Sequence, residues 1–254
     1  MMVDGTMLLV LAGVLGLLFG SFLNVCIYRI PKKESIVTGA SHCTACGTPI
    51  RPGDLIPVFS YLFLRGRCRA CGVHISIRYP LIELINAAAW VFVSLRFGLT
   101  PESLIYCAFA SVLLIAAMID IDTLLVPPSL TVFILVLGAV SLFVLRDMPF
   151  YERLIGLAVG GLPFLLVAVV TRGGMGGGDI KLMAVCGLVL GWRLILLSLL
   201  VSVVAGGVYA AVLLLTKRSK KGAEMPLVPF LSGGMFVCLL WGERLLSWYL
   251  GMFF

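Results

Sequence analysis

Long apolar segments run through almost the whole chain and are interrupted by short polar stretches. They constrain the fold more than any other feature, because about 20 consecutive apolar residues are enough to cross a bilayer as a helix. The composition agrees: 61% of the 254 residues are hydrophobic and only 12% are charged, which is unlike a soluble domain. We therefore expect an all-α integral membrane protein embedded in a lipid bilayer.

About eight of these segments are expected to be transmembrane helices. They cover approximately residues 7–28, 80–95, 104–119, 129–145, 154–171, 180–190, 194–215 and 226–250. The sixth is short, since about eleven residues at about 1.5 Å each do not span the roughly 30 Å hydrocarbon core. A break at Gly191–Arg193 is still preferred to one long helix. It places the basic cluster at residues 217–221 on the same, cytoplasmic side as most other Lys and Arg.

The segments divide the chain into three parts. Residues 1–28 are interpreted as a retained first helix and not a signal peptide, because no Lys or Arg precedes the apolar run and Asp4 stands there instead. Residues 29–79 form a cytoplasmic loop, and residues 80–254 form a polytopic membrane domain. The basic residues flank membrane segments and do not form one patch, so no nucleic-acid partner is expected.

The loop at residues 29–79 contains two Cys-x-x-Cys pairs. The cysteines are Cys43, Cys46, Cys68 and Cys71. In a reducing cytoplasm such pairs hold a metal more often than a disulfide, and four thiolates complete a closed tetrahedral zinc site. We expect a zinc-ribbon-like loop with structural zinc, the alternatives being a redox pair or a metal-free loop. His42 and His74 adjoin the pairs and could replace a cysteine ligand.

Two carboxylates stand at the ends of membrane segments. Asp120 closes the third segment, and Asp179 opens the sixth after the glycine-rich stretch at residues 173–178. The expected topology puts both at one membrane face. Two neighbouring carboxylates cannot both ionise easily, so one keeps a proton and the pair can activate water and protonate a leaving group.

Two further features of this region bear on a carboxylate pair. Asp122 competes with Asp120, but positions i and i+2 of a helix face different directions, so only one of them can face Asp179. Glycines at Gly176 and Gly178 would let the backbone adopt positive φ and approach another segment closely. The alternatives are that the acids only anchor helix ends and that the glycine stretch is a flexible connector.

Several stretches together resemble one known family. They are Gly-Ser-Phe-Leu-Asn-Val at residues 20–25, the paired cysteines, Arg-Tyr-Pro-Leu-Ile-Glu at 78–83, and Gly-Gly-Gly-Asp at 176–179 followed by Lys181. The family is that of the bacterial type IV prepilin peptidases, or leader peptidase/N-methyltransferases, in the GxGD class of membrane aspartyl proteases. In this family pattern the spacing from Asp120 to Pro127 assigns the first catalytic acid to Asp120, with Asp179 as the second.

The resemblance implies an enzyme of the bacterial inner membrane with its active site facing the cytoplasm. It would cleave the leader of prepilins and pseudopilins and then methylate the new N-terminal residue with S-adenosylmethionine. Departures from the family pattern are Pro128, where Asp or Asn is usual, and Gly174, where an acid is frequent. The alternatives are a peptidase without methyl transfer, and a non-enzymatic channel or scaffold with an acidic cation site.

Four polar residues near the first two segments receive lesser assignments. Arg78 and Glu83 are candidates for a methyl-transfer role or for a buried ion pair that holds the loop to the second segment. Ser21 and Asn24 are expected to connect helices through hydrogen bonds.

Overall fold

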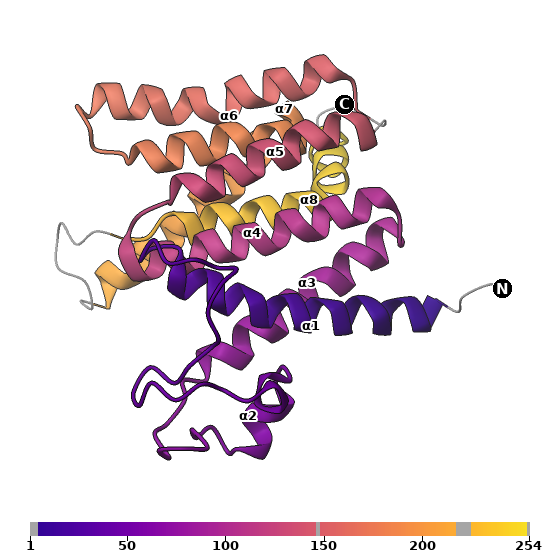
Figure 1. The fold of residues 1–254 in the computed structure, drawn as a ribbon. Helices are drawn as coiled ribbons and strands as arrows, with labels where there is room; N and C mark the ends of the chain where they lie inside the picture. Colours follow the sequence, from indigo (N-terminus) through magenta and orange to yellow (C-terminus); the bar gives the residue numbers. More distant parts are fainter. Residues whose placement is uncertain (1–4, 146–147, 217–224, 253–254) are drawn as a thin grey trace. The chain divides into compact units, whose positions relative to one another are not determined.

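The computed structural model describes residues 5–145, 148–216 and 225–252, and this part of the chain is helical, with no β-strand (Figure 1). The elements are α1 (Gly5–Arg29), the 3₁₀ helix η1 (Pro52–Leu55), α2 (Phe59–Phe63), α3 (Arg78–Phe97), α4 (Pro101–Thr123), α5 (Pro128–Val144), α6 (Phe150–Val170), α7 (Gly177–Leu215) and α8 (Val228–Leu250). The predicted all-α fold is confirmed.

Five helices in the described part are long and apolar enough to cross a membrane, namely α1, α3, α4, α6 and α7, and α5 is a shorter apolar helix. The chain is therefore a multi-pass membrane protein. Six of the eight expected segments each correspond to one helix, and the sixth and seventh both lie within α7. The basic cluster at residues 217–221 lies outside the described residues.

The predicted break in α7 is present. Gly191 has φ 74° and ψ 172°, so the helix consists of two segments that meet at this residue. A positive φ is accessible to glycine without steric cost, and a side chain here would also collide with the sulfur of Met148. Directly after the break, Arg193 lies over the ring of Trp192 and within 3.7 Å of Glu152.

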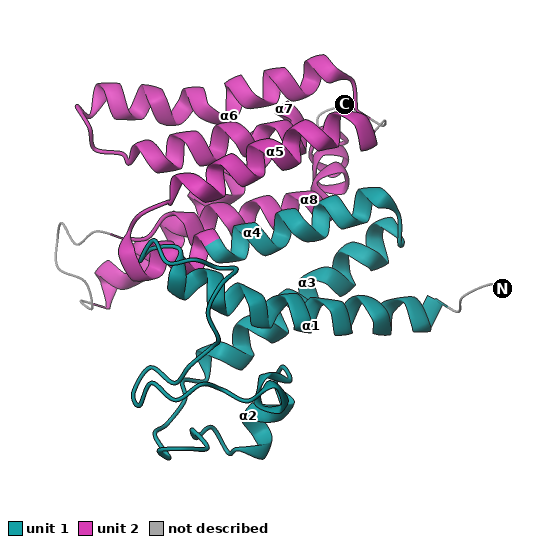
Figure 2. Ribbon diagram, viewed as in Figure 1, with its two compact units in different colours: residues 1–115 teal, residues 116–254 magenta. Residues whose placement is uncertain are grey.

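The chain forms two compact units, residues 1–115 and residues 116–254 (Figure 2). In the first unit α1 packs directly on α3. A Cβ at Gly16 would lie 2.6 Å from the Cα of Ala87, and one at Gly20 would lie 2.7 Å from the Cα of Glu83. Small residues four positions apart let the two backbones touch, which is how many membrane helices associate.

A buried polar network secures this helix pair. The Asn86 amide donates to the Gly16 carbonyl at 2.7 Å, and the Ser111 hydroxyl donates to the Asn86 side-chain oxygen at 2.7 Å. The indole N–H of Trp90 donates to Ser111 at 2.9 Å. Each group finds a partner inside the protein, as polar groups at membrane depth require.

In the second unit α7 packs against α5, α6 and α8. The contact with α6 depends on Gly156 and Gly187, because a Cβ on either would overlap the carbonyl oxygen of the other. Beside it lies Arg153, which directly precedes the expected fifth segment in the sequence but lies inside α6 and is only 2% exposed. Its guanidinium donates to the Ser141 hydroxyl at 2.9 Å and to the Leu188 carbonyl at 3.2 Å.

Candidate active site and metal centre

Each Cys-x-x-Cys pair forms a tight turn of the same design. The Gly47 N–H donates to the Cys43 carbonyl at 2.8 Å, and the Gly72 N–H donates to the Cys68 carbonyl at 2.9 Å. The two glycines have φ values of 70° and 72°, which few other residue types adopt. The glycine after each pair thus turns the chain so that both thiols of the pair point the same way.

The two turns bring four thiols together. Cys43, Cys46, Cys68 and Cys71 have sulfur atoms that all lie within 4.8 Å of one another. The Cys43 and Cys71 sulfurs are 3.9 Å apart, close to the roughly 3.8 Å between sulfurs that sit about 2.3 Å from one tetrahedral zinc ion. The group consists of cysteines alone, without His42 or His74. The donor set therefore fits a metal ion such as zinc.

Local hydrogen bonds prepare two of these thiols for metal binding. Hydrogen bonds with Thr48 lower the pKa of Cys46 to about 6, and the backbone groups of Cys71 and Ala70 lower the pKa of Cys68. The thiolate is the form that ligates metals.

The second turn is tied to the rest of the loop by an ion pair. The Arg69 guanidinium donates to both oxygens of Asp54 at 2.8 and 2.6 Å, and this pairing holds the pKa of Asp54 below its usual value.

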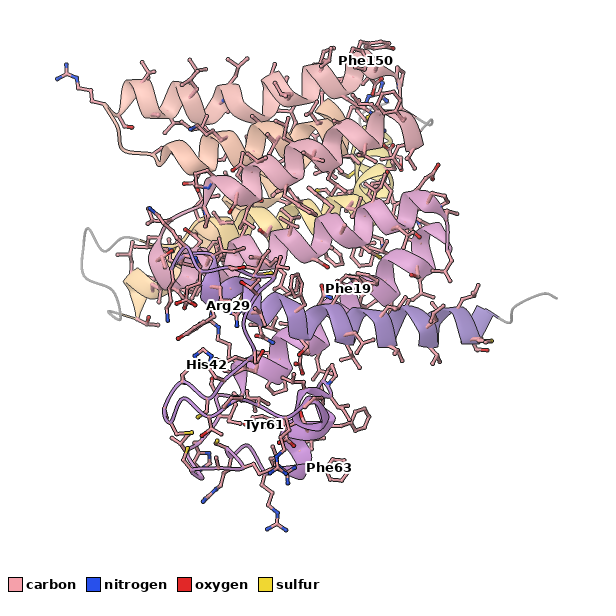
Figure 3. All side chains as sticks on the ribbon, viewed as in Figure 1. Phe19, Arg29, His42, Tyr61, Phe63 and Phe150 are labelled. Carbon is pink, nitrogen blue, oxygen red and sulfur yellow. The ribbon has the colours of Figure 1, made fainter. Side chains whose placement is uncertain are left out.

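Hydrogen bonds attach the loop to two helices of the first unit, α1 and α3 (Figure 3). Arg29, at the end of α1 and 7% exposed, donates to the carbonyls of Ser35 and Thr38 at 2.9 Å and to that of Gly39 at 3.0 Å. On α3 the buried Glu83 carboxylate accepts the Val58 N–H at 2.7 Å. Glu83 does hold the loop to α3, as expected, but it does so through a backbone amide.

Ser21 and Asn24, both on α1, lie at this junction with α3. The Asn24 amide donates to the Tyr79 carbonyl on α3 at 3.2 Å, which connects the helices as predicted. Ser21 forms a hydrogen bond with Glu83. Both residues therefore support the attachment of the loop.

In the second unit the two predicted acids come together. Asp120 lies in the last turn of α4 and is 5% exposed. Asp179 lies half-buried in the first turn of α7, and the two carboxylates interact electrostatically. Asp122 is exposed, so burial separates it from Asp120 as the helical spacing predicts.

Backbone contacts set the approach of the two acids. A Cβ at Gly178 would lie 2.9 Å from the Cβ of Val126, in the turn that follows Asp120, so the start of α7 touches that turn closely. A Cβ at Gly176 would lie 3.4 Å from the Asp179 carboxylate. The role of the glycines is close approach. In the stretch 173–178 a positive φ occurs only at Gly173.

A third element reaches Asp120. The N–H of Val228, the first residue of α8, donates to the Asp120 carboxylate at 2.9 Å. Free N–H groups at a helix start favour nearby anions. The contact joins positions 108 residues apart and uses a backbone group, so no local sequence pattern indicates it directly. The indirect sign was Pro229, since proline is common in the first turn of a helix.

Two family models match parts of the chain. Residues 14–97 match the Bacterial Peptidase A24 N-terminal domain, and residues 107–211 match the Type IV leader peptidase family. The chain is 36% identical over 239 residues to the prepilin leader peptidase/N-methyltransferase of Bacillus subtilis, covering 94% of this chain and 96% of that protein. The chain belongs to the type IV leader peptidase family.

Other family members show the same extent of similarity. The prepilin leader peptidase/N-methyltransferase of Pseudomonas putida is 36% identical over 92% of this chain and 91% of its own length. That of Pseudomonas aeruginosa is 33% identical over 93% and 91%. No solved structure matches the chain. In the present chain, Asp120 and Asp179 both lie in the part that matches the leader peptidase family, and the four cysteines lie in the part that matches the N-terminal domain.

Proposed function

We infer that this protein removes the leader peptide of type IV prepilins and pseudopilins and then methylates the new N-terminal residue. The observation that carries the cleavage step is the meeting of Asp120 and Asp179 at the adjoining ends of α4 and α7. The relatives that match nearly the whole chain bear both activities in their names. A channel or scaffold would leave the paired acids, the glycine contact and these relatives unexplained.

The dyad would act by general acid–base chemistry. One carboxylate takes a proton from water as the water attacks the scissile carbonyl, and the protonated partner gives its proton to the departing amine. The α8 amide at Val228 would fix the orientation of Asp120, and the Gly178 contact with Val126 would set the separation of the acids. The exposed Gly176, where a Cβ would lie 3.4 Å from the Asp179 carboxylate, leaves room beside that acid for an extended substrate and for water.

The four-cysteine centre would hold one structural zinc ion. Four protein ligands leave no open coordination position, so the metal would shape the loop and take no part in hydrolysis. We place the loop and the dyad at the cytoplasmic face of the inner membrane. A topology reporter fused at Arg193 should read periplasmic and one at Arg172 cytoplasmic. A cytoplasmic signal at Arg193 would contradict this placement.

The dyad is tested by three matched substitutions in one membrane preparation. Asp120→Asn and Asp179→Asn remove a charge at nearly constant volume, so each should abolish leader cleavage while the protein still inserts. Asp122→Asn is the control and should cleave normally, because that side chain is exposed. Mass spectrometry of the pilin N-terminus scores cleavage and methylation separately.

Methylation of a pre-cleaved pilin is the second measurement. Both dyad variants should still methylate it if the methyl-transfer site is separate. Normal cleavage by either the 120 or the 179 variant would refute the dyad, and a loss confined to 122 would move the first acid to that position. Cleavage by the unaltered protein without any methylation would leave only the peptidase.

A further inference from the structure

A cavity of about 540 Å³ lies within the first unit, where α1, α3 and the cysteine loop meet. Its size falls in the range of about 300–1,000 Å³ that is typical of small-molecule sites. Neither Asp120 nor Asp179 is among the residues that line this cavity. We therefore ask what the cavity could hold.

The walls of the cavity combine aromatic, acidic and basic groups. Tyr28, Tyr61 and Tyr79 line it from α1, α2 and α3 respectively, and the Glu83 carboxylate lies among them. Tyr61 stands in the loop and Arg29 at the end of α1, with His42 between them in the view of Figure 3. The Glu83 carboxylate is 7% exposed, borders the cavity, and accepts hydrogen bonds from the Val58 N–H and from Ser21.

This chemistry matches one participant of the proposed reaction. S-adenosylmethionine carries an aromatic base, a sulfonium cation and an amino-acid group. Aromatic faces attract both stacked rings and cations, and a carboxylate pairs with positive charge. The described residues contain no strand–helix unit that could form a glycine-rich nucleotide loop, so the donor must be held in another way.

We propose that this cavity is the S-adenosylmethionine pocket, with Glu83 as the charged group that recognises the donor and the cysteine turns as one wall. The proposal rests on the proposed methyl-transfer function. When bound, the donor supplies the methyl group. The tyrosines enclose it, and Glu83, held in place by the Val58 amide, faces its positive charge. Cys43 and Cys68 also line the cavity, so the metal centre shapes the donor pocket.

Donor binding is measured directly on the full-length, zinc-loaded protein in detergent, by equilibrium dialysis with labelled S-adenosylmethionine. Val25→Phe adds bulk to the α1 wall of the cavity and breaks no recorded hydrogen bond. Glu83→Gln removes the charge but keeps an oxygen for the Val58 amide. Each should weaken donor binding about tenfold or more, the effect expected from losing a charged contact or the space for the ligand.

Matched controls separate the pocket from the fold. Val14→Phe makes the same change on an exposed part of α1 and should bind the donor normally. Zinc content and thermal unfolding show whether each variant is folded. If Glu83→Gln does not fold, Val25→Phe still tests the pocket. Ultraviolet cross-linking of labelled donor, mapped by mass spectrometry, should mark peptides within residues 21–83.

The outcomes distinguish the pocket from the function. If the unaltered protein methylates a pre-cleaved pilin but folded Val25→Phe and Glu83→Gln bind donor normally, the pocket is wrong and the function stands. Cross-links confined to residues 116–254 would overturn the pocket in the same way. If the unaltered protein neither binds donor nor methylates, the methyl-transfer function fails and the pocket falls with it.

Discussion

Adding one methyl group at Gly178 should disable cleavage, although the residue carries no chemistry. A Cβ there would lie 2.9 Å from the Cβ of Val126 and 3.4 Å from its carbonyl oxygen. Carbon atoms pack best at about 3.5–4.0 Å, so Gly178→Ala must separate the two segments by at least about 0.6 Å. Misplacement of reacting groups by about 1 Å can cost about 100-fold in rate. We therefore expect a loss of about 10- to 100-fold in kcat/KM, or about 1.4–2.8 kcal/mol of barrier.

Gly177→Ala is the matched control, because nothing lies within 4 Å of a Cβ at that position. It should retain activity and gain helix stability of up to about 1 kcal/mol, the difference between glycine and alanine in a helix. The assay compares initial rates of prepilin cleavage in detergent, with expression level and melting temperature recorded for each variant. Melting matters because overpacking alone costs about 1–3 kcal/mol.

A compensating change tests the cause. Val126→Gly removes the colliding Cβ, so the double variant Gly178→Ala/Val126→Gly should recover much of the activity lost by Gly178→Ala. Full activity in Gly178→Ala would refute the reasoning, as would equal losses in the 177 and 178 variants. Failure of the double variant to improve on Gly178→Ala would show that the Val126 contact is not the cause.

Three further substitutions test other parts of the structure. Cys68→Ser should lose the metal in a zinc assay and expose the loop to protease, whereas Cys107→Ser, which alters a buried cysteine in α4, should keep the full metal content. Asn86→Leu should lower the unfolding free energy by about 1–3 kcal/mol, because it removes the acceptor of the buried Ser111 O–H, which reaches Asn86 from α4; unchanged thermal unfolding would contradict the network. Arg29→Gln should speed proteolysis between residues 30 and 40 while leaving zinc bound, and unaltered digestion would argue against its anchoring role.

The architecture and the candidate residues could be predicted from the sequence wherever a feature depends on residues that are close together in the chain. The break at Gly191 followed from the balance of charge and from the Gly-Trp-Arg sequence. Helical spacing indicates that only one of Asp120 and Asp122 faces Asp179, and the resemblance selects Asp120. The cysteine cluster followed from the paired spacing, because each turn needs only its own residues to form.

Other features depend on partners that no local pattern reveals. From its sequence position Arg153 is a charged residue at a helix end. It is nevertheless buried, because it donates to Ser141 and to the carbonyl of Leu188, which lie far away in sequence. The same holds for the amide that reaches Asp120 from α8. The glycines before Asp179 predict both positive φ and a close approach of two segments. Gly178 makes the close approach, but a glycine sequence does not distinguish conformational freedom from the need for space.

The break at Gly191 also indicates how deep Asp179 lies in the membrane. About twelve residues separate it from Asp179, which at about 1.5 Å per residue is about 18 Å, while the hydrocarbon core is about 30 Å thick. Trp192 and Arg193 are residues that prefer the membrane surface, so Asp179 should lie roughly 12 Å beneath the opposite surface. A substrate that enters from that surface must therefore carry its scissile bond about 12 Å into the hydrocarbon layer before the bond can reach the acids.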